Sequence, residues 1–126
     1  MVPGDLRYTS DHEWVRVEGD EVVVGITQFA ADQLGDVVFV ELPAVGKALK
    51  AHVTFGVVES VKAVSDLFAP IGGEVVGAND ALTASPELVN SDPYDAGWML
   101  RLRPSDAAEI SALLDAAAYE QVVAEG

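Results

Sequence analysis

The chain has 126 residues, of which 50% are hydrophobic and 22% charged, and a formal net charge of −14 at pH 7. This composition predicts a single folded domain spanning 1–126, because disordered chains lack the apolar residues that a core needs. The negative charge argues against nucleic acid and anionic membranes as partners, and the absence of cysteine excludes disulfides and thiolate sites.

The first predicted element is a β-hairpin formed by residues 12–18 and 21–26. Both segments are rich in β-branched residues, and Gly19-Asp20 between them is a typical turn sequence. Thr27 is placed to cap a short helix that runs through Leu34. Gly35 then suits the left-handed conformation that ends a helix.

The middle of the chain predicts further strands, since apolar and β-branched runs alternate there with proline and glycine turns. They are expected at 36–42, 47–54 (an edge strand), 55–61, 64–69 and 74–77. Residues 79–95 should be mostly loop, with one helical turn near 87–88.

The C-terminal part predicts a last strand over 98–102 and two helices. Ser105 or Asp106 is placed to cap the first of these helices, and Asp115 to cap the second over 116–124. The apolar stripe of the first helix is formed by Ile110, Leu113 and Leu114.

Lys62 is the candidate functional residue. The other lysines, Lys47 and Lys50, lie together in a polar connection, whereas Lys62 stands alone between valine-rich strands, at a predicted hairpin tip. A Schiff-base lysine needs a desolvating pocket, which an exposed tip does not provide. Two interpretations remain, a solubilising surface lysine or an amine modified to carry a group among several active sites.

No catalytic constellation stands out. The sequence contains no P-loop, no HExxH and no Gly-x-Ser-x-Gly motif. His12-Glu13 suggests a base and its orienter, although a packed or solvated histidine is the commoner case. We therefore expect a non-catalytic protein. It should be cytoplasmic and have no membrane partner, because we find neither a targeting sequence nor an apolar run approaching the roughly 18 residues of a membrane span.

From about Tyr8 to about Ala124 the chain resembles the H proteins of the glycine cleavage system, a family of lipoyl carriers. The resemblance rests on His12–Val15, Val24–Thr27, Leu34–Pro43, Val57–Asp66, Ala69-Pro70, Gly73–Val75, Asn90–Tyr94, Gly97-Trp98 and Pro104-Ser105. Biotinyl carriers flank their lysine with methionines, and the lipoyl domains of acyltransferases usually show Asp-Lys-Ala. Val61-Lys62-Ala63 is the H-protein form.

The resemblance implies a mainly β fold, the lipoyl/biotinyl-type barrel-sandwich hybrid, with a short internal helix and C-terminal helices. It implies lipoic acid amide-linked to Lys62. Glu59 and the turn glycines Gly46 and Gly73 match positions on which the family's lipoylating enzymes depend. Glycines at those places would permit tight turns that set the angle of the hairpin.

The family's loaded arm folds back into a surface groove, which shields the aminomethyl amine from water. By position, Glu13 and Asp66 would line that groove, where a carboxylate would pair with the ammonium. One departure concerns residues 50–54, which lack the glycine usual in the family's turn at this place. A non-glycine residue there, such as His52, is expected at positive φ.

The implied function is a shuttle that acts as a monomer. Its partners would be glycine decarboxylase (P protein), aminomethyltransferase (T protein), dihydrolipoamide dehydrogenase (L protein) and a lipoate ligase or lipoyl/octanoyl transferase. Two alternatives stay open. One is a lipoyl relay that donates lipoate to other enzymes, and the other is an unmodified β-sandwich interaction module in which Lys62 is incidental.

Overall fold

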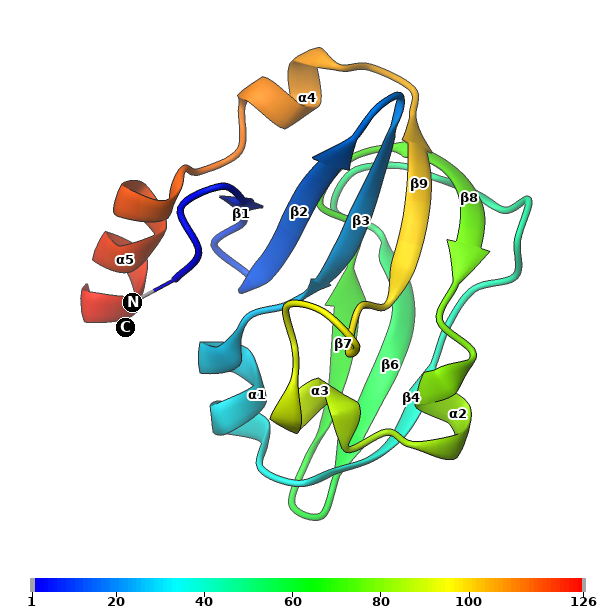
Figure 1. Cartoon of the computed structure of the whole chain (residues 1–126), viewed down its shortest axis with the longest axis vertical. Coiled ribbons are helices and arrows are strands. Elements are labelled where there is room, and N and C mark those ends of the chain that lie inside the picture. Colours follow the sequence, from blue (N-terminus) through cyan, green and yellow to red (C-terminus); the bar gives the residue numbers. More distant parts are fainter. Residues whose placement is uncertain (1, 126) are drawn as a thin grey trace.

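Two antiparallel sheets form the centre of the computed structural model, which describes residues 2–125 (Figure 1). The larger sheet has the order β1-β2-β3-β9-β8-β5, and the smaller has the order β4-β6-β7. The strands are β1 (Arg7–Tyr8), β2 (Glu13–Glu18), β3 (Glu21–Ile26), β4 (Val37–Glu41), β5 (Ala48–Leu49), β6 (Thr54–Ser60), β7 (Val64–Phe68), β8 (Gly73–Ala78) and β9 (Leu100–Pro104). The predicted mainly β, sandwich-type fold is confirmed.

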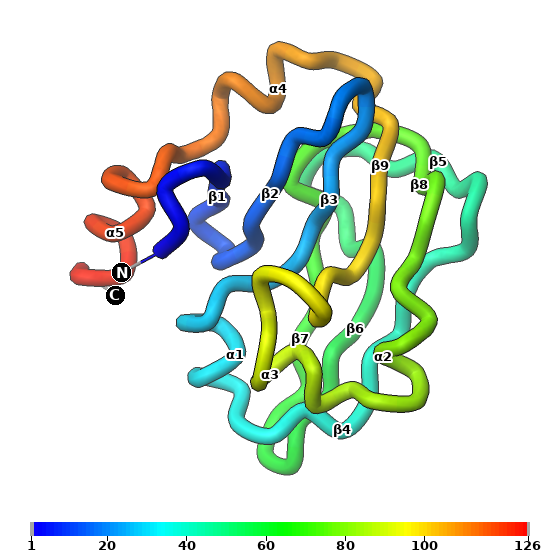
Figure 2. The backbone as a smooth tube through the Cα atoms, in the orientation of Figure 1, coloured from blue at the N-terminus to red at the C-terminus, as the bar shows by residue number. Residues whose placement is uncertain are grey.

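Within the described residues 2–125, five short helices lie outside the sheets (Figure 2). They are α1 (Gln28–Leu34), α2 (Ala81–Ala84), α3 (Leu88–Ser91), α4 (Ala108–Ser111) and α5 (Ala116–Glu125). The longest of these has 10 residues. Across residues 2–125, none has the length and apolar character required to cross a membrane.

The core consists of two clusters on opposite faces of the β2–β3 hairpin. Val15, Val22 and Val24 point towards the smaller sheet, where they join residues such as Val58 and Leu67. The neighbouring residues of the same hairpin, which alternate in direction, contribute to a second cluster under α5. That cluster consists of Leu6, Tyr8, Trp14, Val23 and Tyr119. Both faces of the hairpin therefore contribute to the core, as its β-branched sequence favours, whereas the end of β2 is exposed.

The predicted start and end of α1 are confirmed. The Thr27 hydroxyl accepts a hydrogen bond from the Ala30 amide at 3.2 Å, as an N-cap should. Gly35 ends the helix as predicted, but at φ 79° and ψ −159° and not in the left-handed helical conformation; this backbone region is open essentially to glycine alone. Asp115 likewise begins α5, because its carboxylate accepts from the Ala118 amide at 2.8 Å.

His52 has a φ of 73°, as expected for the glycine-free turn that precedes β6. Its amide donates to the Ala69 carbonyl at 2.8 Å, and the Val53 amide closes the turn on the Lys50 carbonyl at 3.3 Å. The two hydrogen bonds hold the imidazole-bearing residue in a conformation that L-residues other than Asn, Asp and His seldom adopt.

The C-terminal part differs from the prediction in two places. Residues 79–95 contain a helix, α2, that the loop-like composition concealed, and buried Leu82 anchors it. Helix α4 is only four residues long and ends before Leu113 and Leu114. Leu114 instead exchanges two backbone hydrogen bonds with Tyr8, each 2.8 Å long. This long-range pairing stops the helix that the apolar stripe predicted.

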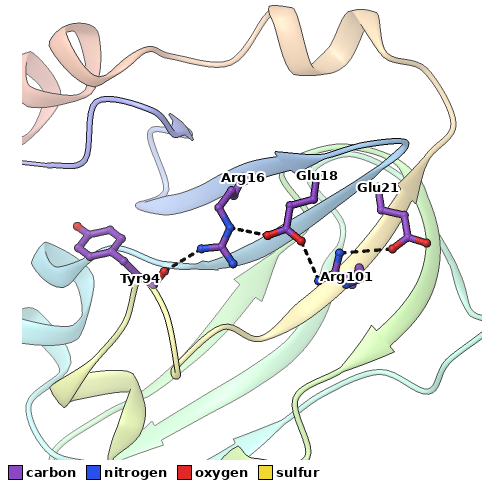
Figure 3. Close-up of polar contacts among 5 residues, drawn as sticks. All are labelled: Arg16, Glu18, Glu21, Tyr94 and Arg101. Carbon is purple, nitrogen blue, oxygen red and sulfur yellow. Dashed lines mark hydrogen bonds and ion pairs between the residues drawn. The ribbon is translucent and has the colours of Figure 1, made fainter.

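An alternating row of arginines and glutamates covers the exposed face of the larger sheet (Figure 3). Arg16 bonds Glu18 at 2.8 Å, and Arg101 bridges Glu18 at 3.0 Å and Glu21 at 3.4 Å. The row continues through Arg103, which lies 3.9 Å from Glu21 and 3.5 Å from Glu74. We call this set of three arginines and three glutamates the ion-pair row.

Candidate functional site

Lys62 lies at the tip of the β6–β7 hairpin, at the foot of the molecule in Figure 1. The Ser60 amide donates to the Ala63 carbonyl at 2.8 Å, which closes the turn. The Ser60 hydroxyl in addition accepts from the Lys62 and Ala63 amides at 3.3 and 3.1 Å. Lys62 is exposed, and its neighbours Val61 and Val64 are 71% and 68% exposed. The turn is therefore closed by backbone and hydroxyl hydrogen bonds, and the lysine amine is accessible.

A groove of about 370 Å³ runs alongside this hairpin. Its walls come from β2, α1, the β6–β7 pair and α5, and it contains both Glu13 and Asp66. The other lining residues are Asp11, His12, Ile26, Phe29, Ala30, Gln33, Leu34, Val58, Ser65, Leu67 and Val122. The structure thus brings together Glu13 and Asp66, which lie 53 positions apart in the sequence, in a groove that contains a third carboxyl group, that of Asp11. Just over half of the lining residues are apolar.

Glu13 is buried, with only 2% of its surface exposed. The Thr9 hydroxyl donates to its Oε1 at 2.7 Å, and the Phe68 amide donates to its Oε2 at 3.4 Å. Burial raises the pKa of the carboxyl to about 7, against the smaller stabilising effect of the Thr9 hydroxyl. Glu13 therefore changes its charge near neutral pH, whereas Asp66 is exposed at the groove edge.

Replacing Glu13 with glutamine should make the stability of the protein less sensitive to pH. Because folding raises the Glu13 pKa from 4.5 to about 7, the folded state binds more protons in that interval and loses stability as pH rises through it. Glutamine carries no such penalty. The free energy of unfolding of Glu13→Gln minus that of wild type should therefore rise by roughly 2 kcal/mol from pH 5 to pH 8. Urea unfolding of both proteins at each pH measures the change, and a constant difference would contradict it.

His12 packs into the wall of the groove and does not pair with Glu13. Its Nδ1 lies 2.8 Å from the Tyr119 hydroxyl, which lies 2.7 Å from the Thr27 hydroxyl. The imidazole also contacts the Phe29 ring, with 4.7 Å between ring centroids. Burial lowers the pKa of His12, which favours the neutral ring. The base-and-orienter interpretation of His12-Glu13 therefore has no hydrogen bond to support it among the described residues.

Gly46 and Gly73 lie together at the β5–β8 pair, away from the lysine tip. Gly46 has a φ of 98° and its amide donates to the Val75 carbonyl at 2.7 Å, so it is a turn glycine as predicted. Gly73 is different, because it is the first residue of β8 and not part of a turn. A Cβ on Gly73 would come within 2.5 Å of the Arg103 carbonyl oxygen, so glycine is needed there for close strand approach.

Glu59 precedes the tip on β6, where it pairs with Val64 of β7 and Phe39 of β4. It is half-buried. Its position beside the tip is the one that the sequence predicted, and a role in recognition by a lipoylating enzyme stays a prediction.

Sequence reasoning missed two residues near the lysine. Gly35, predicted only as a helix stop, lies under the lysine side chain, because a Cβ on it would be 3.4 Å from Lys62 Cε. Asn90 belongs to the Asn90–Tyr94 stretch that resembles the family, and its side chain bonds the residues on both sides of Asp36. The glycine in Leu34-Gly35-Asp36 was a visible signal, whereas nothing local marked Asn90.

Comparison with known proteins agrees with the resemblance seen in the sequence. A family model described as glycine cleavage H-protein matches residues 6–126. A glycine cleavage system H protein of Magnetococcus marinus is 66% identical over 118 residues, covering 94% of this chain and 84% of the relative. A glycine cleavage system H protein of Symbiobacterium thermophilum is 61% identical over 125 residues, covering 99% of this chain and 98% of the relative.

The fold agrees as well. The crystal structure of a glycine cleavage system H protein from Mycobacterium marinum matches with a TM-score of 0.90 at 43% identity, covering 98% of this chain and 99% of that one. The family model and these relatives extend over nearly the whole chain, including the lysine hairpin and the groove. The chain therefore belongs to the glycine cleavage H-protein family.

Proposed function

We propose that this chain is the lipoyl-carrying shuttle of a glycine cleavage system, with lipoic acid amide-linked to Lys62. The observation that carries the proposal is an exposed lysine at a hairpin tip beside a groove that contains a buried carboxyl. The tip suits a modifying enzyme, which must reach the amine. The groove suits a tethered group, which must be sheltered between visits to its partners.

The proportions of the site fit a tether on Lys62. Asp66 is four residues beyond the lysine, which is at most roughly 13 Å at the spacing of an extended strand. A lysine side chain lengthened by an acyl chain has a comparable reach. The apolar side chains of Phe29, Leu34 and Val58 in the groove suit a hydrocarbon arm. When bound, the lipoyl group would supply a disulfide that accepts the aminomethyl group.

The residues of the chain would bind and protect what the arm carries. We assign Glu13 and Asp66 to pairing with the aminomethyl ammonium, since a charge-assisted hydrogen bond is strongest where water is excluded. The Thr9 hydroxyl and the Phe68 amide orient the Glu13 carboxyl towards this task. The neutral His12 beside them adds no positive charge that would repel an ammonium.

Catalysis would lie with the partners, and the chain would act as a single non-catalytic carrier domain. The proposed partners are glycine decarboxylase, aminomethyltransferase and dihydrolipoamide dehydrogenase, with a lipoate ligase or lipoyl/octanoyl transferase to load Lys62. Glu59, Gly46 and Gly73 are proposed to matter for that loading. We further propose that the carrier is monomeric and cytoplasmic.

Reconstituted exchange between glycine and labelled bicarbonate tests the shuttle. With glycine decarboxylase present, the lipoylated chain should support exchange, and the unlipoylated chain should support essentially none, because only the loaded arm reaches the partner's active site. Lipoylated protein that gives no exchange would overturn the shuttle. Transfer of lipoate to other enzymes in the absence of exchange would instead indicate the relay function.

A further inference from the structure

The Asn90 side chain clamps the connection between α1 and β4. Its Oδ1 accepts a hydrogen bond from the Val37 amide at 2.9 Å, and its Nδ2 donates to the Gly35 carbonyl at 2.8 Å. The same Nδ2 lies 3.5 Å from the Ala31 carbonyl. One amide from α3 thus bonds the residues on both sides of Asp36, more than 50 positions away in the sequence.

This connection supports the lysine tip. The Asp36 carbonyl, held between the two clamped residues, accepts from the Val61 amide at 3.1 Å. Val37 also pairs with Ser60 at the end of β6. The Lys62 side chain runs over Gly35, where a Cβ would stand 3.4 Å from Lys62 Cε and 4.0 Å from Nζ. The tip therefore contacts the clamped connection through its backbone and through the lysine side chain.

The Asn90 side chain adds to two backbone hydrogen bonds at this connection, from the Gly35 amide to the Ala31 carbonyl and from the Val61 amide to the Asp36 carbonyl, each 3.1 Å long. Gly35 lacks a Cβ and sits at φ 79°, where glycine is unusually free to change conformation. The pairing of β4 with β6 is irregular between Val37 and Phe39. At this glycine and irregular strand start, the amide of Asn90 supplies the two side-chain hydrogen bonds that hold the Gly35 carbonyl and the Val37 amide in place.

We propose that Asn90 is a positioning residue for Lys62, which holds the Gly35–Val37 connection so that the lysine tip stands in one orientation. The inference rests on the proposed function, because it concerns acylation of the same lysine. Asn90 is remote from the exposed turn itself, so it should affect the chemical step of lipoylation and not docking of the ligase. A reacting amine that is misplaced by about 1 Å loses on the order of 10-fold to 100-fold in rate.

Lipoylation kinetics of three variants test the proposal. Asn90→Asp keeps the size of the side chain and the oxygen that accepts from the Val37 amide. It replaces the Nδ2 donor with a second oxygen, which cannot bond the Gly35 carbonyl. Asn90→Ala removes both bonds. Ser91→Ala is the matched control, since the exposed Ser91 hydroxyl donates to the Glu87 carbonyl, which precedes α3 in the chain and is not part of the Gly35–Val37 connection. With a lipoate ligase, both Asn90 variants should lose on the order of 10-fold in kcat with KM changed less than about 2-fold. Ser91→Ala should match wild type.

Amide exchange of Val61 provides a readout that general destabilisation does not mimic. In the Asn90 variants the Val61 amide should exchange faster while the Val24 amide in the core stays protected. Wild-type kcat in both Asn90 variants, or a rise in KM alone, would overturn the positioning role. Failure of wild type itself to become lipoylated would overturn the proposed function instead, so the two failures are distinguishable.

Discussion

Replacing Lys62 with arginine should abolish lipoylation completely. Arginine preserves the positive charge and a long aliphatic stem at the tip, so the exposed hairpin should keep its structure. Its guanidinium, however, stays protonated and offers no free amine for acylation. After co-expression with a lipoate ligase, intact-mass spectrometry should find one lipoyl group on wild type and none on Lys62→Arg. The same variant should then give no glycine–bicarbonate exchange.

The other lysines provide the control. Lys47→Arg and Lys50→Arg change lysines in the connection around β5 and should retain the full mass gain. A mass gain that survives Lys62→Arg would place the modification elsewhere. If wild type gains no mass, the chain is better explained as an unmodified interaction module.

Replacing Gly56 with alanine should lower the stability of the protein strongly, although it adds only one methyl group to the smaller sheet. Gly56 is buried in β6, and a Cβ there would overlap the Glu41 carbonyl oxygen of β4. A backbone carbonyl in a paired strand cannot rotate away, so β4 and β6 must separate. We expect a loss of roughly 3 kcal/mol and a fall in Tm of about 10 °C, which thermal and urea unfolding would measure.

Gly77→Ala is the matched control in β8. A Cβ on Gly77 would lie 3.5 Å from Arg101 Cβ, which is an ordinary contact. Its stability should stay within about 0.5 kcal/mol of wild type. Equal effects of the two substitutions would contradict the steric argument, because they would then reflect only the loss of glycine from a strand.

Features with local causes were predictable from the sequence. The Thr27 cap and the Gly35 stop depend on residues within one turn of the chain, and the positive φ of His52 follows from a short turn that lacks glycine. The lysine tip was predictable for the same reason, since a hairpin is formed by adjacent strands. Family resemblance added the cofactor, which hairpin geometry alone does not specify.

Features with long-range causes were not predictable. The early end of α4 depends on Leu114 pairing with Tyr8, and a helical stripe in one segment gives no sign of it. Gly73 looked like a turn glycine because it follows Pro70 and Gly72, yet the constraint on it comes from the Arg103 carbonyl of β9. The clamp by Asn90 likewise joins segments more than 50 residues apart.

The burial of Glu13 belongs to the same class. Resemblance placed Glu13 beside the groove, but its pKa of about 7 follows from the desolvation created when β2, β7 and the Thr9 loop pack together. A glutamate in an alternating strand sequence has no local feature that indicates such burial. The sequence therefore predicted the position of Lys62 and its hairpin better than the burial of the groove residues.

The ion-pair row makes the electric field of the protein directional. Its three arginines and three glutamates cancel, so the whole charge of −14 belongs to the remaining surface. Segments 36–41 and 54–68, which form the smaller sheet, contain four acidic residues and Lys62 as their one cation. Acylation of Lys62 removes that cation. A basic protein that approaches from solution therefore experiences a torque that turns it away from the neutral face before any contact is made.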